Sequence, residues 1–221
     1  MNTQEKDMTK ELFLEIGTEE IPAAFLPKAI KDMDDMIRKA LDDVRIAFGT
    51  VKTLATPRRL CLAVTQVSSR QADQLVEKMG PAKKAAFDAQ GNPTKAAIGF
   101  ARGQGMEVTD LQTFTTDKGE YLMARKTIAG VPTLELLPEI LSRIVLGLPF
   151  RKSMRWSDLD IRFARPVHWI VALFGDEIVP FRVGNIETGR HSQGHRFMSP
   201  DAFEVADFAD YLKKTRDGFV I

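Results

Sequence analysis

Arginine, histidine and tryptophan, the residue types best suited to bind an anion and stack on a flat ring, occur together in one window, residues 151–197. This window holds all three histidines and both tryptophans of the chain, and Lys152 is its only lysine beside seven arginines. Arginine presents a planar fork of donors that matches phosphate and stacks on rings, whereas lysine is a point charge. Arginine grouped with tryptophan and histidine is therefore typical of a surface that binds RNA backbone and unstacked bases.

The candidate RNA-binding residues come from this window and from one upstream turn. The segment Thr56–Arg59 is expected to be a tight connection between two strands that directs both of its arginines outward. The candidates are Arg58, Arg59, Arg151, Lys152, Arg155, Trp156, Arg165, His195 and Arg196. Paired arginines on a turn are also common on a plain solvated surface. Trp169 begins an apolar run and is expected in the core.

Two other groups have residue types suited to acid–base or metal chemistry. Glu19 and Glu20 are adjacent carboxylates, but after Thr18 they also fit a helix start, where acids favour the positive end of the dipole. We predict the helix start. His191 and His195 have the spacing of a zinc pair on a helix, but glycines interrupt the segment and no glutamate follows the first histidine. We predict a phosphate-facing or packed loop there instead.

Hydrophobic periodicity predicts the elements that must position these residues. In chain order they are a strand at 12–16, a helix at 23–46, strands at 51–56 and 60–67, a helix at 94–102, a hairpin of 111–115 with 121–128, a helix at 134–146, an antiparallel pair of 167–174 with 178–183, and a helix at 201–216.

The predicted fold class is α+β, with mixed, mostly antiparallel sheets packed against amphipathic helices. The texture changes over residues 71–129, which are rich in lysine, alanine and glycine and contain several turn signals. We predict a small inserted α+β module there. It would interrupt a main α+β domain made of 11–70 and 130–221, preceded by a disordered extension at 1–10.

Composition is that of an ordinary globular chain of 221 residues, with 44% hydrophobic and 28% charged residues. The net charge of +1 gives no global basic field that would attract nucleic acid. Charge is unevenly spread, however. Residues 1–50 hold seven basic and eleven acidic residues, a balance of −4, whereas 151–196 hold eight basic and five acidic ones, a balance of +3. An RNA-facing surface should therefore come from the later segments.

The remaining sequence signals concern compartment and completeness. Cys61 is the only cysteine, so the sequence has no disulfide framework or thiolate cluster, and an inert buried thiol is expected. No signal peptide and no apolar run of membrane-spanning length is present, which predicts a cytoplasmic protein with no membrane partner. A strand expected to begin at Gly218 stops within four residues, which suggests part of a longer chain.

A family resemblance is carried by short motifs that occur in a fixed order. They are FLEIGTEEIP at 13–22, TPRRL at 56–60, KSMRW at 152–156, FARPVHWI at 163–170 and GHRF at 194–197. Together they resemble the beta subunit of the bacterial tetrameric glycyl-tRNA synthetase, from about Glu11 to the last residue. In that family the beta chain is longer, and its later part carries an HD-like domain and an anticodon-binding domain.

The resemblance implies a division of labour between two subunits. Glycine activation with ATP and Mg, followed by glycyl transfer, would occur on the alpha subunit. This chain would correspond to a beta-subunit N-terminal region without a catalytic site or a cofactor of its own. It would support binding of tRNA(Gly) and assembly with alpha, and no DNA partner is expected.

Two alternatives remain open. The first is a structural scaffold that docks the alpha subunit or the rest of the beta chain without touching RNA, because arginine and tryptophan are also enriched at protein interfaces. The second is an independent small-molecule enzyme that uses Glu19 with Glu20, or His191 with His195. That enzyme would need these groups to converge in one concave pocket.

Overall fold

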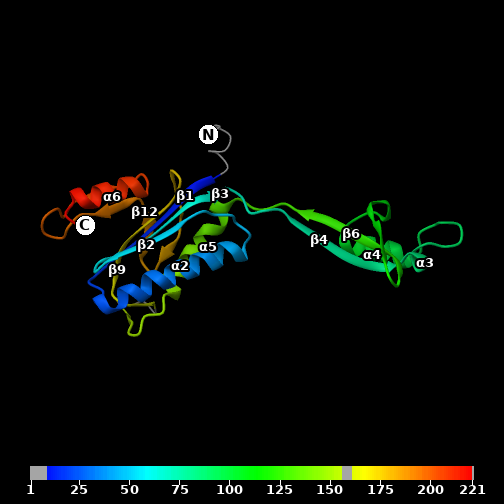
Figure 1. The fold of residues 1–221 in the computed structure, drawn as a ribbon, viewed down its shortest axis with the longest axis horizontal. Helices are drawn as coiled ribbons and strands as arrows, with labels where there is room; N and C mark the ends of the chain where they lie inside the picture. Colours follow the sequence, from blue (N-terminus) through cyan, green and yellow to red (C-terminus); the bar gives the residue numbers. More distant parts are fainter. Residues whose placement is uncertain (1–8, 156–160, 221) are drawn as a thin grey trace. The chain divides into compact units, whose positions relative to one another are not determined.

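The computed structural model describes residues 9–155 and 161–220, and they form two compact units (Figure 1). Unit 1 comprises the chain up to Gln71 and from Val131 onward, and unit 2 comprises Ala72–Gly130. Most strands in both units pair antiparallel, which confirms the predicted α+β class. The expected disordered extension 1–10 falls largely outside the described residues, and Thr9 already belongs to a strand.

The centre of unit 1 is a sheet built around β1 (Thr9–Thr18). This strand pairs antiparallel with β3 (Arg59–Ser68) on one side and with β9 (Val167–Phe174) on the other. The outer strands are β2 (Val51–Thr56) beside β3, and β10 (Glu177–Ile178), β11 (Arg182–Val183) and β12 (Ile186–Gly189) on the β9 side. Only β12 with β9 is a parallel pair among the strands described.

The two faces of this sheet pack against different helices, because successive side chains of a strand point to opposite sides. Helices α2 (Leu26–Asp43) and α5 (Thr133–Gly147) share the main hydrophobic core with alternate residues of β1, Leu12, Leu14 and Ile16. The opposite face of β1 packs with α6 (Phe208–Asp217), so the sheet lies between the two layers (Figure 1). Two cores therefore hold the sheet from both sides.

The first helix begins later than the sequence predicted. Thr18 is the last residue of β1, and the chain turns through η1 (Ala23–Phe25) before α2 starts at Leu26. Pro27 sits in the first turn of α2, where a missing N–H costs nothing. Glu19 and Glu20 thus lie between strand and helix, and the predicted cap at Thr18 is wrong.

The C-terminal part of unit 1 also differs from the prediction. The expected loop contains β13 (His191–Gln193), which pairs with β14 (Ala202–Glu204). Helix α6 therefore starts only at Phe208, where the Asp207 side chain accepts a hydrogen bond from the Asp210 N–H and caps the first turn.

Unit 2 is a three-stranded antiparallel sheet in the order β4 (Gln74–Ala82), β6 (Gly119–Ile128), β5 (Gln112–Thr116). Its short helices are α3 (Lys83–Ala86), α4 (Lys95–Gln104) and η2 (Val108–Asp110). The predicted 111–115 and 121–128 hairpin is confirmed as β5 and β6. Across the described residues, no helix has the length and apolar character that a membrane crossing requires.

Candidate functional site

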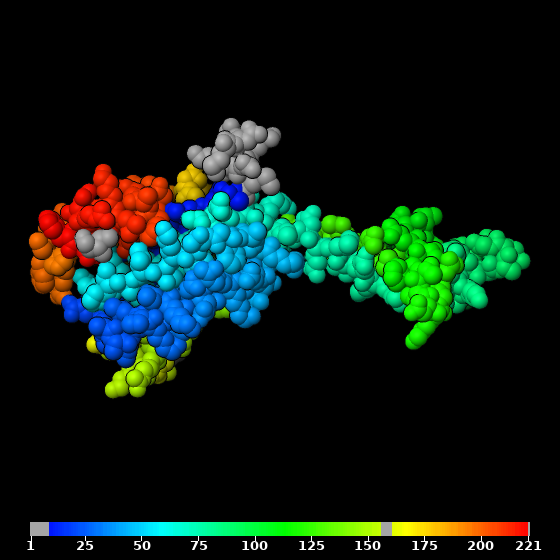
Figure 2. Space-filling view, viewed as in Figure 1, coloured from blue at the N-terminus to red at the C-terminus, as the bar shows by residue number. Residues whose placement is uncertain are grey.

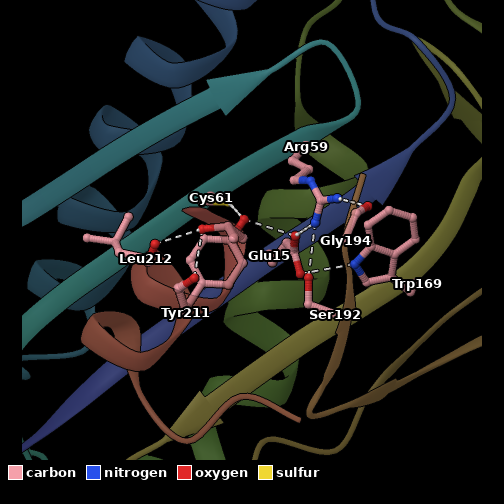
Figure 3. Close-up of polar contacts among 9 residues, drawn as sticks. Glu15, Arg59, Cys61, Trp169, Ser192, Gly194, Tyr211 and Leu212 are labelled. Atoms are coloured by element: carbon pink, nitrogen blue, oxygen red, sulfur yellow. Dashed lines mark hydrogen bonds and ion pairs between the residues drawn. The ribbon is translucent and has the colours of Figure 1, made fainter. Parts of the chain in front are cut away.

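A buried carboxylate lies at the centre of the second core. Glu15 projects from the middle of β1 and is fully inaccessible to solvent. Its Oε1 accepts hydrogen bonds from Arg59 Nη1 and from the Tyr211 hydroxyl, both at 3.0 Å, and its Oε2 accepts one from Trp169 Nε1 at 3.0 Å (Figure 3). Donors on both oxygens compensate the charge, which would otherwise be very costly to bury.

Arg59 does not point outward as predicted but lies inside the protein. Its residue surface is 3% exposed, because its position on β3 faces the same side of the sheet as Glu15. Besides Glu15 it donates to Ser192 Oγ at 3.1 Å and to the Gly194 carbonyl at 3.0 Å. Its guanidinium also lies 5.3 Å from the centre of the Trp169 ring. Arg59 therefore connects β1, β13 and the following loop inside the protein, and it is not available to an external phosphate.

Gly17 and Trp169 fit together without room for another atom. The two residues are opposite each other in the β1–β9 pairing, and a Cβ on Gly17 would lie 1.9 Å from Trp169 Cε2. The missing side chain lets the indole lie flat over the strand, where its N–H reaches Glu15. The prediction that Trp169 belongs to the core is confirmed, since it is buried.

The remaining members of this buried cluster are chemically quiet. Cys61 Sγ lies 3.0 Å from the Tyr211 hydroxyl, and both groups are buried. Burial raises the pKa of the Cys61 thiol, and the nearby Glu15 charge raises it further. Burial likewise raises the pKa of the Tyr211 hydroxyl. Both groups stay protonated at neutral pH, so the cluster offers no thiolate nucleophile.

A pocket of about 360 Å³ opens beside this cluster. It forms where the β2–β3 turn meets the loop after β13, two segments that lie side by side in the space-filling view as cyan and orange (Figure 2). Its lining residues are Glu20, Thr56, Pro57, Arg58, Arg59, Gly194, His195, Arg196, Phe197 and Val220. The pocket thus brings together four of the predicted candidates, Arg58, Arg59, His195 and Arg196. Arg59 is buried, so it contributes little surface to the pocket.

Arg58 lines this pocket and carries a buried donor. The residue is half-buried, and its Nε is enclosed without a hydrogen-bond partner among the described residues. Leaving a buried donor unsatisfied costs about 1–3 kcal/mol, and more when the group is charged. The enclosed Nε thus adds a local cost, whereas the part of Arg58 that lines the pocket brings a positive charge to it.

The loop after β13 is held in shape by its own backbone. A Cβ on Gly194 would lie 2.1 Å from the Ser199 carbonyl oxygen, so only glycine allows the tight return. The His195 N–H donates to the Gly218 carbonyl at 2.8 Å. His195 Nδ1 accepts from the N–H groups of Phe197 and Met198, both at 3.3 Å, which leaves only Nε2 to face a ligand.

Phe197 is an aromatic pocket residue that was not among the predicted candidates. Its side chain is exposed, with 79% of the residue surface accessible, and the Arg196 guanidinium lies 5.1 Å from its ring centre. The signal was the position of an aromatic residue directly after His195 and Arg196 in a glycine-containing loop. An exposed ring beside a cation is a surface on which a flat group can stack.

The other predicted candidates lie elsewhere. Arg165 is next to the pocket, because its Nε donates to the Glu20 carbonyl at 2.9 Å. Arg151 lines a separate small cavity of about 60 Å³ near the start of α2. Lys152 is exposed, and Arg155 lies in β7 (Met154–Arg155), which pairs with β8 (Arg162–Phe163). Trp156 lies outside the described residues.

The acidic and imidazole groups are spread over several places. Glu19 Oε1 lies 2.9 Å from His168 Nε2 on the surface, whereas Glu20 lines the pocket. His191 is exposed in β13, and His195 is engaged within its loop. Within 9–155 and 161–220, no group of three or more His, Cys, Asp or Glu side chains is placed to hold a metal ion.

Four of the five motifs meet at this site, since Glu15, Arg59, Trp169 and Gly194 belong to four of them. Comparison with known proteins places the chain among the aminoacyl-tRNA synthetases. The family described as glycyl-tRNA synthetase beta subunit matches residues 12–221, and the chain belongs to that family. The resemblance predicted from the sequence is confirmed.

Individual relatives agree with this assignment. The chain is 62% identical to the glycine–tRNA ligase beta subunit of Syntrophotalea carbinolica and 59% identical to that of Syntrophus aciditrophicus. Each alignment covers 97% of this chain and 31% of the relative. The chain thus spans about a third of the length of the curated relatives it matches.

Proposed function

We propose that this chain is the N-terminal region of a glycine–tRNA ligase beta subunit that binds tRNA(Gly) and supports assembly with the catalytic alpha subunit in the cytoplasm. The observation that carries the tRNA part is the pocket, which Arg58 and Arg196 line together with the exposed Phe197. Arginine and an exposed aromatic ring are the groups that bind RNA phosphate and unstacked bases. Arg165 next to the pocket adds a further positive charge.

Catalysis is assigned to the alpha subunit, which would use ATP with Mg for the ATP-dependent glycylation of tRNA. This region would hold neither the catalytic site nor a cofactor. The geometry supports that assignment, because Glu19 and Glu20 diverge and the buried Cys61 thiol stays protonated. An oriented acid–base pair in one pocket is what the enzyme alternative required.

A second candidate function is a docking scaffold without RNA contact. Phe197, which lines the pocket, and the next residue, Met198, are 79% and 61% exposed, and such exposed apolar side chains also occur where a partner protein binds. In that case the pocket region would contact the alpha subunit or a later part of the beta chain.

The two functions are separated by changing Arg58 and Arg196 together to alanine in the complete alpha–beta assembly. We expect weaker tRNA binding and a shallower dependence of affinity on salt. One lost phosphate contact should lower the slope of log K against log salt by roughly 0.7–0.9. Assembly with the alpha subunit, measured by size-exclusion chromatography, should not change.

The matched control removes two exposed arginines elsewhere in unit 1, Arg143 on α5 and Arg182 on β11, each of which pairs only with an exposed carboxylate. This variant has the same net charge as the test variant and should bind tRNA as the parent does. If the pocket variant retains full affinity and slope while it still assembles, the RNA proposal fails. Loss of assembly instead supports the scaffold.

A further inference from the structure

We infer that the pocket between the β2–β3 turn and the loop after β13 accepts a single unstacked nucleotide of the bound RNA, with the base on Phe197 and the phosphate on Arg58. This inference rests on the proposed function and adds to it a mode of recognition. A surface that bound only phosphates would need only positively charged side chains. This pocket also has an exposed aromatic ring and apolar side chains, which are suited to contact the face of a base.

Size and lining fit one nucleotide. The pocket volume of about 360 Å³ is at the lower end of the range of roughly 300–1,000 Å³ for small-molecule sites. Pro57, Val220 and Phe197 supply apolar surface, whereas Arg58 and Arg196 supply charge. A paired duplex offers its phosphates but keeps its base faces stacked, so a concave site of this composition suits a base that has left its stack.

The phosphate position is set by Arg58. Arg58 lines the pocket and is half-buried, and no carboxylate ion pair occupies its guanidinium among the described residues. Charge-assisted hydrogen bonds from guanidinium to phosphate are short and strong, so the part of this side chain that faces the pocket would bind one. The neighbouring Arg59 is buried and donates to Glu15, Ser192 and Gly194, so the charge available to the ligand is that of Arg58.

The base position is set by Phe197. The Phe197 N–H donates to His195 Nδ1, which holds the backbone of Phe197 in place. The Arg196 guanidinium lies 5.1 Å from the centre of the Phe197 ring. The ring is nevertheless 79% exposed, so it retains surface on which a base can stack. Guanidinium planes and aromatic rings both stack on bases, so Arg196 and Phe197 together form a platform.

Glu20 also lines the pocket, and its negative charge must be accounted for. It would repel a second phosphate, which argues for one nucleotide and against a run of backbone. A carboxylate accepts hydrogen bonds from an amino group at a base edge, as with N4 of cytosine. Arg165 holds this segment through the Glu20 carbonyl. A base that carries an exocyclic amino group is therefore the favoured occupant.

The test is Phe197→Ala in the complete alpha–beta assembly, with tRNA(Gly) transcript as the probe. Loss of one stacked base should weaken binding by about 5- to 150-fold, corresponding to 1–3 kcal/mol. The salt slope should stay unchanged, because no phosphate contact is lost. Phe197→Trp should retain the affinity. Phe219→Ala, at a residue that is 57% exposed and does not line the pocket, is the control and should have no effect.

A second measurement identifies the nucleotide directly. A photoreactive benzophenone amino acid at position 197 should cross-link to one unpaired nucleotide of the tRNA, and Arg58→Ala should reduce that cross-link. If Phe197→Ala binds normally while the Arg58 and Arg196 variant is weakened, the inference fails and the proposed function stands. If neither variant changes tRNA affinity, both fail. Cross-linking to the alpha subunit in place of tRNA also overturns the inference.

Discussion

Replacing Arg59 by methionine removes the positive partner of a carboxylate that solvent does not reach. Arg59 and Glu15 have side-chain exposures of 4% and 0% and are 3.0 Å apart. After the change, Glu15 keeps only the Tyr211 and Trp169 donors. Removing one partner of a buried ion pair costs about 3–5 kcal/mol, because the other charge stays buried. The loss also frees the Gly194 carbonyl, so the pocket loop loses a tether.

This loss can be measured by thermal unfolding followed by tryptophan fluorescence, since both tryptophans of the chain belong to unit 1. A domain of this size loses about 2–4 °C of melting temperature per kcal/mol, so Arg59→Met should lower the midpoint by roughly 6–20 °C. The double variant Glu15→Gln with Arg59→Met should lose less unfolding free energy than the sum of the two single variants. Each single variant leaves one unpaired buried charge, whereas the double variant leaves none.

The control is Arg182→Ala, which breaks an exposed ion pair with Glu187 and should cost about 0–1 kcal/mol. If Arg59→Met costs no more than this surface change, or if the double variant is simply additive, the buried pair does not hold the second core together. Our account of why Arg59 turns inward would then be wrong.

Three further predictions follow from the same region. Gly17→Ala should destabilise unit 1 by at least about 1–3 kcal/mol in thermal unfolding, because the new Cβ would overlap the Trp169 ring. Gly194→Ala should distort the pocket loop and weaken tRNA binding more than it lowers the melting temperature. The raised pKa of Cys61 and Tyr211 predicts that stability falls as pH rises above about 9, because the unfolded state then releases protons that the folded state retains.

Each of these has a contrasting measurement. Gly189→Ala meets no atom within 4 Å and should be nearly silent in the same melting experiment, so equal effects at positions 17 and 189 would contradict the packing argument. For Gly194, a melting temperature that falls while tRNA affinity stays constant would be the wrong result. For pH, Cys61→Ser should flatten part of the alkaline decline. An unchanged pH profile in that variant would assign the decline to Tyr211 or to other groups.

Local patterns predicted much of unit 1. The repeat of Met33, Ile37 and Leu41 indicated α2 before any tertiary contact was known, and the apolar run from Trp169 indicated β9. Element type followed from short-range spacing, because one face of each element is buried against a core. β4 was missed, since Glu77, Lys78 and Gly80 interrupt the strand pattern and its order comes from pairing with β6.

The site was only partly predictable, for a different reason. Four of its basic residues were found from composition, but the sequence around Arg59 reads as an exposed turn. Its direction is decided by Glu15, 44 residues away, and by Ser192, 133 residues away. Phe197 was missed because an exposed aromatic ring and a core one look the same in a single sequence. Whether a side chain at the end of a strand points inward depends on hydrogen-bond partners that are distant in the sequence and become neighbours only in the folded protein.

Arg59 on β3 donates a hydrogen bond to the Gly194 carbonyl, so the loop that forms one wall of the pocket is attached directly to the central sheet. A ligand would then meet a wall that is already in place, and association would lose little conformational freedom there. The same linkage works in the other direction. A molecule bound at this mouth would resist separation of α6 from the sheet, so occupancy should slow amide exchange deep in the second core, far from any atom the ligand touches.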